Sequence, residues 1–183
     1  MSRLAFCVSR TRQDLTLDVP VVGVEALARW YNAERGWISP GEFVPLAEHN
    51  DLAAGLDRAI LRQTLAELGM WADHTDAALR LSVNLSGASV RDAGHRRRVF
   101  GDVRASGVSP QRLEIELTET TLAQAIDEDV SRVLGDLSGL GIGFAIDDFG
   151  TGYGSLTYPR NLPIARIKID RVFVQGATES SSD

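Results

Sequence analysis

The stretch G-F-A-I-D-D-F-G-T-G-Y-G-S-L, residues 143–156, joins an apolar run to two adjacent carboxylates and a glycine-rich turn. The run has the composition of a buried strand, and Asp147 and Asp148 follow it directly. Two neighbouring carboxylates at the end of a buried strand repel each other and lose hydration, so a cation normally offsets the cost. One interpretation is therefore a divalent metal site. The alternative is that one aspartate caps the following turn through its side-chain oxygen.

Length and charge narrow the class of protein. The chain has 183 residues and is 44% hydrophobic, which is enough for a sizeable core in a single domain. Its net charge of -6 argues against a broad basic face for nucleic acid, because binding to phosphates needs clustered Lys and Arg. Cys7 is the single cysteine, and the sequence has no signal peptide or membrane span, so we expect a cytoplasmic protein.

Apolar segments of two periodicities alternate along the chain. Residues recurring at steps of three and four from Leu52 to Trp71 predict an amphipathic helix. Further helices are expected over residues 40–49, 89–105 and 122–140, with a loop over 30–36. Strands are expected within residues 4–8, 19–30, 79–86, 112–119, 144–146 and 165–169.

Each strand after the first carries a polar residue in or near its apolar run. Strand and helix alternation predicts parallel strands joined by right-handed crossovers, as in a TIM barrel, whose chemistry lies at the carboxyl ends of the strands. The polar residues should therefore meet at one mouth. Carboxylate and carboxamide oxygens suit Mg²⁺ or Mn²⁺. These polar residues are Glu25, Asn84, Glu116, Asp147 with Asp148, and Lys168.

Some of these charged residues allow a second interpretation. Glu25 either pairs with Arg29 or lies on a ligand, because an unpaired carboxylate in an apolar run is costly. Lys168 either extends to the surface or is held against an anion. Glu114 and Glu116 share one face of their strand, which is expensive unless that face meets water, bases or metal.

The histidines and a basic run are expected at the surface. His49, His74 and His95 lie in polar contexts without ligand spacing to one another. The run H-R-R-R at residues 95–98 predicts a solvated helix face, with contact to an anion or a partner as the alternative.

Six motifs in order resemble one protein family, the EAL-domain cyclic di-GMP phosphodiesterases. The match extends over about residues 19–174, which makes it very specific. Its motifs are V-G-V-E-A-L-A-R-W at 22–30, S-P-G-E-F-V-P-L-A-E at 39–48, V-N-L-S at 83–86, E-L-T-E at 116–119, D-D-F-G-T-G-Y at 147–153 and K-I-D-R at 168–171.

This resemblance implies a TIM-barrel-like EAL fold and hydrolysis of cyclic di-GMP to linear pGpG with two Mg²⁺ or Mn²⁺ ions. The implied metal ligands are Glu25, Asn84, Glu116, Asp147 and Asp148. The implied catalytic residues are Lys168, Glu25 and Asp148; Arg29 and Leu27 would bind substrate, and Glu119 would stabilise the loop after Asp148.

The sequence also departs from the family pattern. We count about six of the eight strands of a closed barrel, so the EAL domain is expected to be incomplete at its C-terminus, and an open edge would pair with a second copy or another chain. Residues 1–18 match the family poorly, residues 19–175 form the partial domain, and residues 176–183 are expected to be disordered. Activity of this chain is therefore open. The alternatives are an inactive module that binds cyclic di-GMP or a partner, and a non-functional gene remnant.

Overall fold

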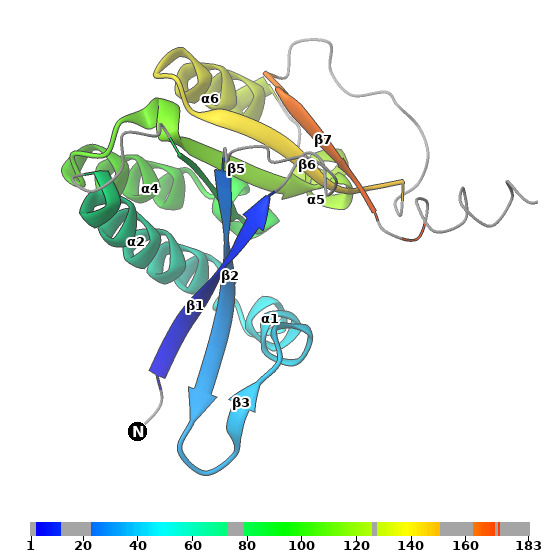
Figure 1. Ribbon diagram of the computed structural model, residues 1–183. Coiled ribbons are helices and arrows are strands. Elements are labelled where there is room, and N and C mark those ends of the chain that lie inside the picture. The colour runs from blue at the N-terminus through cyan, green and yellow to red at the C-terminus, as the bar shows by residue number, and fades with distance from the viewer. Residues whose placement is uncertain are drawn as a thin grey trace, which may run out of the picture.

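A computed structural model of the chain describes residues 3–11, 23–72, 79–125, 128–150, 163–170 and 172 (Figure 1). Its strands are β1 (Arg3–Thr11), β2 (Gly23–Asn32), β3 (Gly36–Ile38), β4 (Arg80–Asn84), β5 (Leu113–Thr118), β6 (Gly143–Phe149) and β7 (Arg166–Ile169). Its helices are α1 (Pro40–His49), α2 (Ala53–Ala72), α3 (Gly87–Arg91), α4 (Ala93–Ala105), α5 (Glu119–Ala125) and α6 (Glu128–Gly139), with a 3-10 turn at Pro110–Arg112.

The strands form one sheet in the order β1-β2-β4-β5-β6-β7. Every pair from β2 to β7 along this path is parallel, whereas β1 runs antiparallel to β2. In Figure 1, α2 and α4 lie side by side next to the strands that they connect. The predicted mixed α/β fold with a parallel sheet is confirmed, and all six expected strands are present.

A hairpin between β2 and β3 occupies the segment predicted as a loop. The side chain of Asn32 explains the tight turn, because its Oδ1 accepts hydrogen bonds from the backbone N–H groups of Glu34 and Arg35. Gly36 closes the turn with φ +75°, a conformation that favours glycine. The loop prediction is confirmed for residues 33–35 but was wrong for residues 30–32 and 36, which belong to strands; β3 has only three residues, too few to show a periodicity.

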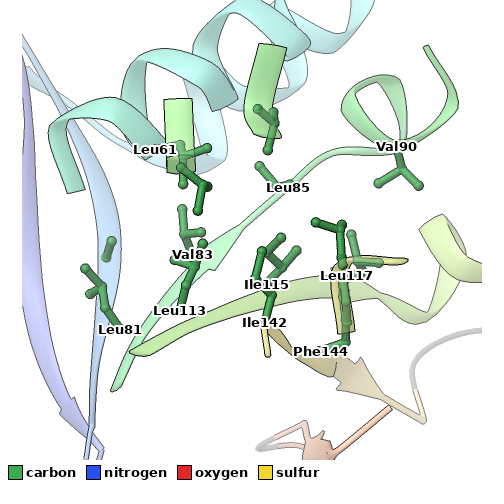
Figure 2. Packing of buried hydrophobic residues seen from close by; sticks show 14 of the residues in the cluster. Leu61, Leu81, Val83, Leu85, Val90, Leu113, Ile115, Leu117, Ile142 and Phe144 are labelled. Carbon is green, nitrogen blue, oxygen red and sulfur yellow. The ribbon is translucent and has the colours of Figure 1, made fainter. Parts of the chain in front are cut away.

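The core lies between the sheet and the helices that cover it. Leu61, Leu65 and Leu68 line one face of α2 and are at most 2% exposed. Full burial of such a side chain stabilises the fold by about 1.5–3 kcal/mol. Figure 2 shows Leu61 in one cluster with side chains of β4, β5 and β6, which include Leu81, Val83, Leu113, Ile115 and Phe144.

One of the predicted helices is divided. The helix expected over residues 89–105 consists of α3 and α4, which are separated at Asp92. The side chain of Asp92 accepts a hydrogen bond from the backbone N–H of His95 and so caps the start of α4. The stretch expected as a helix over residues 122–140 contains α5 and α6, and residues 126–127 between them lie outside the described part of the chain.

His95 is not the surface residue that we expected. Its side chain is 15% exposed, and Nε2 hydrogen-bonds the backbone oxygen of Ala54 at the start of α2. The next residue, Arg96, binds the backbone oxygens of Val90 and Arg91 at the end of α3. Part of the basic run therefore holds helices together. The expectation for His49 is confirmed, because it is exposed.

Two other expectations concern residues outside the described part of the chain. They are the surface position of His74 and the disorder of residues 176–183. Among the described helices, none has the length and apolar character needed to cross a lipid bilayer.

An ion pair between α2 and α4 depends on pH in a way that can be measured. Arg58 donates two hydrogen bonds to Asp102, at 2.6 and 3.1 Å, and these bonds hold the pKa of that carboxyl below its usual range. Because the pKa is lowered on folding, the pair stabilises the fold above the unfolded pKa of about 4 and this contribution is lost as the pH falls through the folded pKa. Asp102→Asn should therefore lower the melting temperature at pH 7 by roughly 2–4 °C.

The control for this prediction is Asp136→Asn, at an exposed aspartate of α6. Thermal unfolding of both variants and the wild type between pH 7 and pH 3 gives the comparison. The deficit of Asp102→Asn should shrink towards pH 3. A deficit that is constant over this range would contradict the assignment of the stability to the ionised pair.

Candidate metal and substrate site

Five strands bring their polar side chains to one end of the parallel sheet. Asn84 is the last residue of β4, and Glu116 lies opposite it in register on β5. Glu25 is near the start of β2, but only residues 23–26 of that strand pair with β4. It therefore also lies where the parallel pairing ends. Asp147 of β6 and Lys168 of β7 complete the group.

Three carboxylates and one ammonium form the centre of this group. Glu25, Glu116 and Asp147 each place one oxygen within 4.8 Å of the others. Lys168 Nζ lies 2.7 Å from Glu116 Oε2, 3.3 Å from Glu25 Oε2 and 3.4 Å from Asp147 Oδ1. Glu25 thus forms its ion pair with Lys168, and Lys168 is held against anions, as one of our two interpretations expected.

Burial and neighbouring charges shift the pKa values of Glu116 and Lys168. Burial raises the pKa of Glu116 to about 7; Lys168 opposes this rise, and the charges of Glu25 and Asp147 add to it. Burial alone would lower the pKa of Lys168. The hydrogen bond to Glu116 and the surrounding carboxylates outweigh burial and raise that pKa. Lys168 therefore stays protonated at neutral pH and offsets part of the repulsion among the acids.

A β-bulge places both aspartates of the opening motif opposite Lys168. Ile146 pairs with Ile167 and Phe149 pairs with Ile169, so two residues of β6 face one residue of β7. Asp148 takes φ +52°, which is uncommon for a residue other than glycine. Its side chain is exposed, and partial desolvation and then the charge of Asp147 raise its pKa.

Asn84 and Glu119 lie at the border of the cluster. The amide of Asn84 donates to Glu25 Oε1 at 3.3 Å. Glu119, the first residue of α5, is 7% exposed, and its Oε2 accepts the backbone N–H of Gly150 at 3.0 Å. Glu119 therefore contacts the chain two residues after Asp148, which is the position that the resemblance implied for it.

A cavity of about 420 Å³ opens beside Asn84. This volume lies within the range of small-molecule sites. Leu27 and Arg29 of β2 line one wall, and the start of α1 lines another. Arg29 donates to the backbone oxygen of Ala28 at 2.8 Å. The two residues that the resemblance assigned to substrate thus lie together at this cavity.

A second polar layer lies beneath the cluster, two residues earlier on three strands. Glu114 is 2% exposed; it accepts a hydrogen bond from Ser82 Oγ at 3.0 Å and lies 3.5 Å from Arg166 Nε. Our sequence reasoning noted Glu114 but missed Ser82 and Arg166. The signal was available, because residues two positions apart on a strand share a face.

The donor set fits a hard divalent cation. Three carboxylate oxygens converge around the position of an ammonium group, with a carboxamide at the border. Oxygen ligands of this kind are those that Mg²⁺ and Mn²⁺ prefer. With all four groups ionised, three negative charges and one positive charge leave a net charge of -2 at the cluster, which favours a divalent ion.

Comparisons with known proteins agree with this geometry. Residues 16–183 match the EAL domain family. The chain is 39% identical over 165 residues to the bifunctional diguanylate cyclase/cyclic di-GMP phosphodiesterase MucR of Pseudomonas aeruginosa, covering 90% of this chain and 24% of that protein. A second cyclic di-GMP phosphodiesterase of Pseudomonas aeruginosa is 38% identical over 162 residues, covering 87% of this chain and 27% of that protein. This chain thus spans about a quarter of the length of these two relatives.

Solved structures give the same result. The PaMucR phosphodiesterase in its c-di-GMP complex superposes with a TM-score of 0.84 at 35% identity, covering 96% of this chain and 70% of that one. The FimX EAL domain from Pseudomonas aeruginosa bound to c-di-GMP gives a TM-score of 0.76 at 25% identity, covering 97% of this chain and 69% of that one. The sheet, the order of the motifs and these similarities together show that the chain belongs to the EAL domain family.

Proposed function

We propose that this chain is a metal-dependent phosphodiesterase that hydrolyses cyclic di-GMP to linear pGpG. The observation that carries the proposal is the convergence of Glu25, Glu116 and Asp147 within 4.8 Å, with Lys168 in contact with all three. A cavity of about 420 Å³ is lined by Asn84, which hydrogen-bonds to Glu25. The names of the relatives give the substrate class.

Each residue of the site has a proposed part. Glu25, Asn84, Glu116 and Asp147 would hold the first Mg²⁺ or Mn²⁺, and Asp147 with Asp148 would border a second. Such ions supply charge stabilisation at phosphate and an acidified water.

The chain's own groups would act on substrate and water. The Lys168 ammonium is held by the three carboxylates, where it would help to orient a water molecule at the cluster. Arg29 lines the cavity, where its guanidinium would meet a substrate phosphate. Leu27 lines the same cavity, and its side chain would pack on the ligand. Glu119 would keep Asp148 in place through the backbone of Gly150.

The first experiment is hydrolysis of cyclic di-GMP by the purified chain with Mg²⁺ or Mn²⁺, followed by chromatography. We expect the linear product to form. Glu25→Ala should reduce the rate by more than about 100-fold, because removing a metal ligand should cost more than removing a residue that only hydrogen-bonds to a ligand. Glu34→Ala, at an exposed glutamate in the turn between β2 and β3, is the matched control and should retain the rate.

Other outcomes would change the proposal. A folded chain that binds cyclic di-GMP without forming product would support the alternative of an inactive binding module. A rate that Glu25→Ala leaves unchanged would contradict the proposed site.

A further inference from the structure

A buried aspartate outside the cluster holds the segment that follows Asn84. Asp57 lies on α2 and is 8% exposed. One of its oxygens, Oδ2, accepts three hydrogen bonds: from the backbone N–H of Ser86 at 2.7 Å, from Ser86 Oγ at 2.6 Å and from Ser89 Oγ at 2.7 Å. Hydrogen bonds to an ionised carboxylate are about twice as strong as those between neutral groups.

These bonds fix the connection between β4 and α3 from one side. From the other side, the backbone N–H of Leu85 donates to the backbone oxygen of Glu116 at 3.0 Å. The two residues after Asn84 are thus bound to different elements: Leu85 to β5 and Ser86 to α2. The position of its side chain beside Glu25 therefore depends on both attachments.

Burying a carboxylate at this position carries a desolvation cost, which the three hydrogen bonds to Oδ2 offset. Burial raises the pKa of Asp57, and the hydrogen bonds from Ser86 and Ser89 limit the rise. α3 has five residues, and its start could be capped by the hydroxyl of Ser86, which instead turns to Asp57. Asp57, Leu85 and Ser86 also line the cavity next to Asn84. Asp57 therefore links α2 to the wall of the cavity beside Asn84.

We propose that Asp57 is a positioning residue that sets the place of Asn84 in the metal cluster by anchoring Ser86 and Ser89. This inference rests on the proposed function, in which Asn84 is a metal ligand. Asp57 acts through the backbone after β4 and is not one of the proposed metal ligands.

The test measures Mn²⁺ affinity by calorimetric titration and amide hydrogen exchange over residues 84–91. Asp57→Asn keeps the size of the side chain but removes its charge. We expect the Kd for Mn²⁺ to rise by about 10-fold or more, the size of effect seen when a residue that supports a metal ligand is removed. Amide hydrogen exchange over residues 84–91 should also become faster. Asp102→Asn is the control, because it weakens a different α2 contact while leaving the segment after β4 untouched.

A double-mutant cycle separates positioning from a general loss of stability. If Asp57 acts through Asn84, adding Asp57→Asn to Asn84→Ala should raise the Kd little further. Removing both hydroxyl donors with Ser86→Ala and Ser89→Ala should weaken Mn²⁺ binding in the same direction as Asp57→Asn. This pair tests the same contacts if Asp57→Asn does not fold.

Three results would overturn the inference. They are an unchanged Kd in Asp57→Asn, an equal rise of the Kd with and without Asn84, and a rise in Asp102→Asn as large as that in Asp57→Asn. A wild-type chain that binds Mn²⁺ without hydrolysing cyclic di-GMP would contradict the proposed reaction, while the comparison of Kd values would still decide the role of Asp57. A wild-type chain that binds no Mn²⁺ would overturn both.

Discussion

Lys168→Met should destabilise the metal-free chain and make its stability depend on Mn²⁺. Lys168 contacts three carboxylates, of which Glu116 is 2% exposed, so removing the ammonium leaves their charges uncompensated. Breaking a fully buried pair costs about 3–5 kcal/mol and a surface pair contributes about 0–1. The side chain of Lys168 is 28% exposed, so we expect a loss between these limits, roughly 1–3 kcal/mol.

The same variant should bind Mn²⁺ at least as tightly as the wild type, because no ammonium competes for the carboxylates. Mn²⁺ at 100 times its Kd would restore about 2.7 kcal/mol of stability. Hydrolysis should nevertheless fall by about 10²-fold, because the attacking water loses the group that orients it. Urea unfolding with and without Mn²⁺, together with the hydrolysis assay, measures all three effects.

Lys168→Arg is the matched control. It keeps the positive charge, so the metal-free chain should retain most of its stability, but the planar guanidinium cannot replace the ammonium in orienting water. Equal stability of Lys168→Met and the wild type without metal would contradict the compensating role of Lys168.

Glu116→Gln should weaken metal binding and leave the stability of the metal-free chain nearly unchanged. Glutamine has nearly the same size as glutamate but removes one negative charge from the cluster. Lys168 still contacts Glu25 at 3.3 Å and Asp147 at 3.4 Å, so the stability of the metal-free chain should change little. The Kd for Mn²⁺ should rise by more than about 100-fold, because affinity for a hard cation depends on the charge of its ligands. Hydrolysis should fall with it.

The control for Glu116→Gln is Glu48→Gln, at an exposed glutamate of α1 that lines the cavity beside Asn84. It should leave the Kd for Mn²⁺ unchanged. Tight Mn²⁺ binding by Glu116→Gln would show that the metal lies elsewhere, whatever the activity of the variant.

The sequence predicted those parts of the fold that depend on short-range patterns. On β5 the alternation of residues 113–117 correctly placed Glu114 and Glu116 on one face, and on α2 the steps of three and four correctly gave the buried stripe. Both patterns follow from backbone geometry that repeats within a few residues. Breaks within such patterns were missed, as at Asp92, where a cap ends one helix and begins the next.

The sequence predicted which residues form the candidate site but not which of them contact one another. The order of strands and helices implied that Glu25, Asn84, Glu116, Asp147 and Lys168 would converge, and the structure brings them together. Their roles as metal ligands and catalytic groups remain predictions. The sequence left two partners open for Glu25, and it carried no sign that Asp57 would bind Ser86 and Ser89.

The sequence by itself thus determined the family, the order of the elements and the polar residues at the strand ends, because these follow from motifs and local periodicity. The tertiary structure decided the pairing of Lys168 with Glu116 across 52 residues, the bulge that sets Asp147 and Asp148 opposite Lys168, and the burial that raises the pKa of Glu116. The physical reason is that desolvation and charge pairing depend on which groups surround a side chain in space, and those neighbours come from strands far apart in the chain.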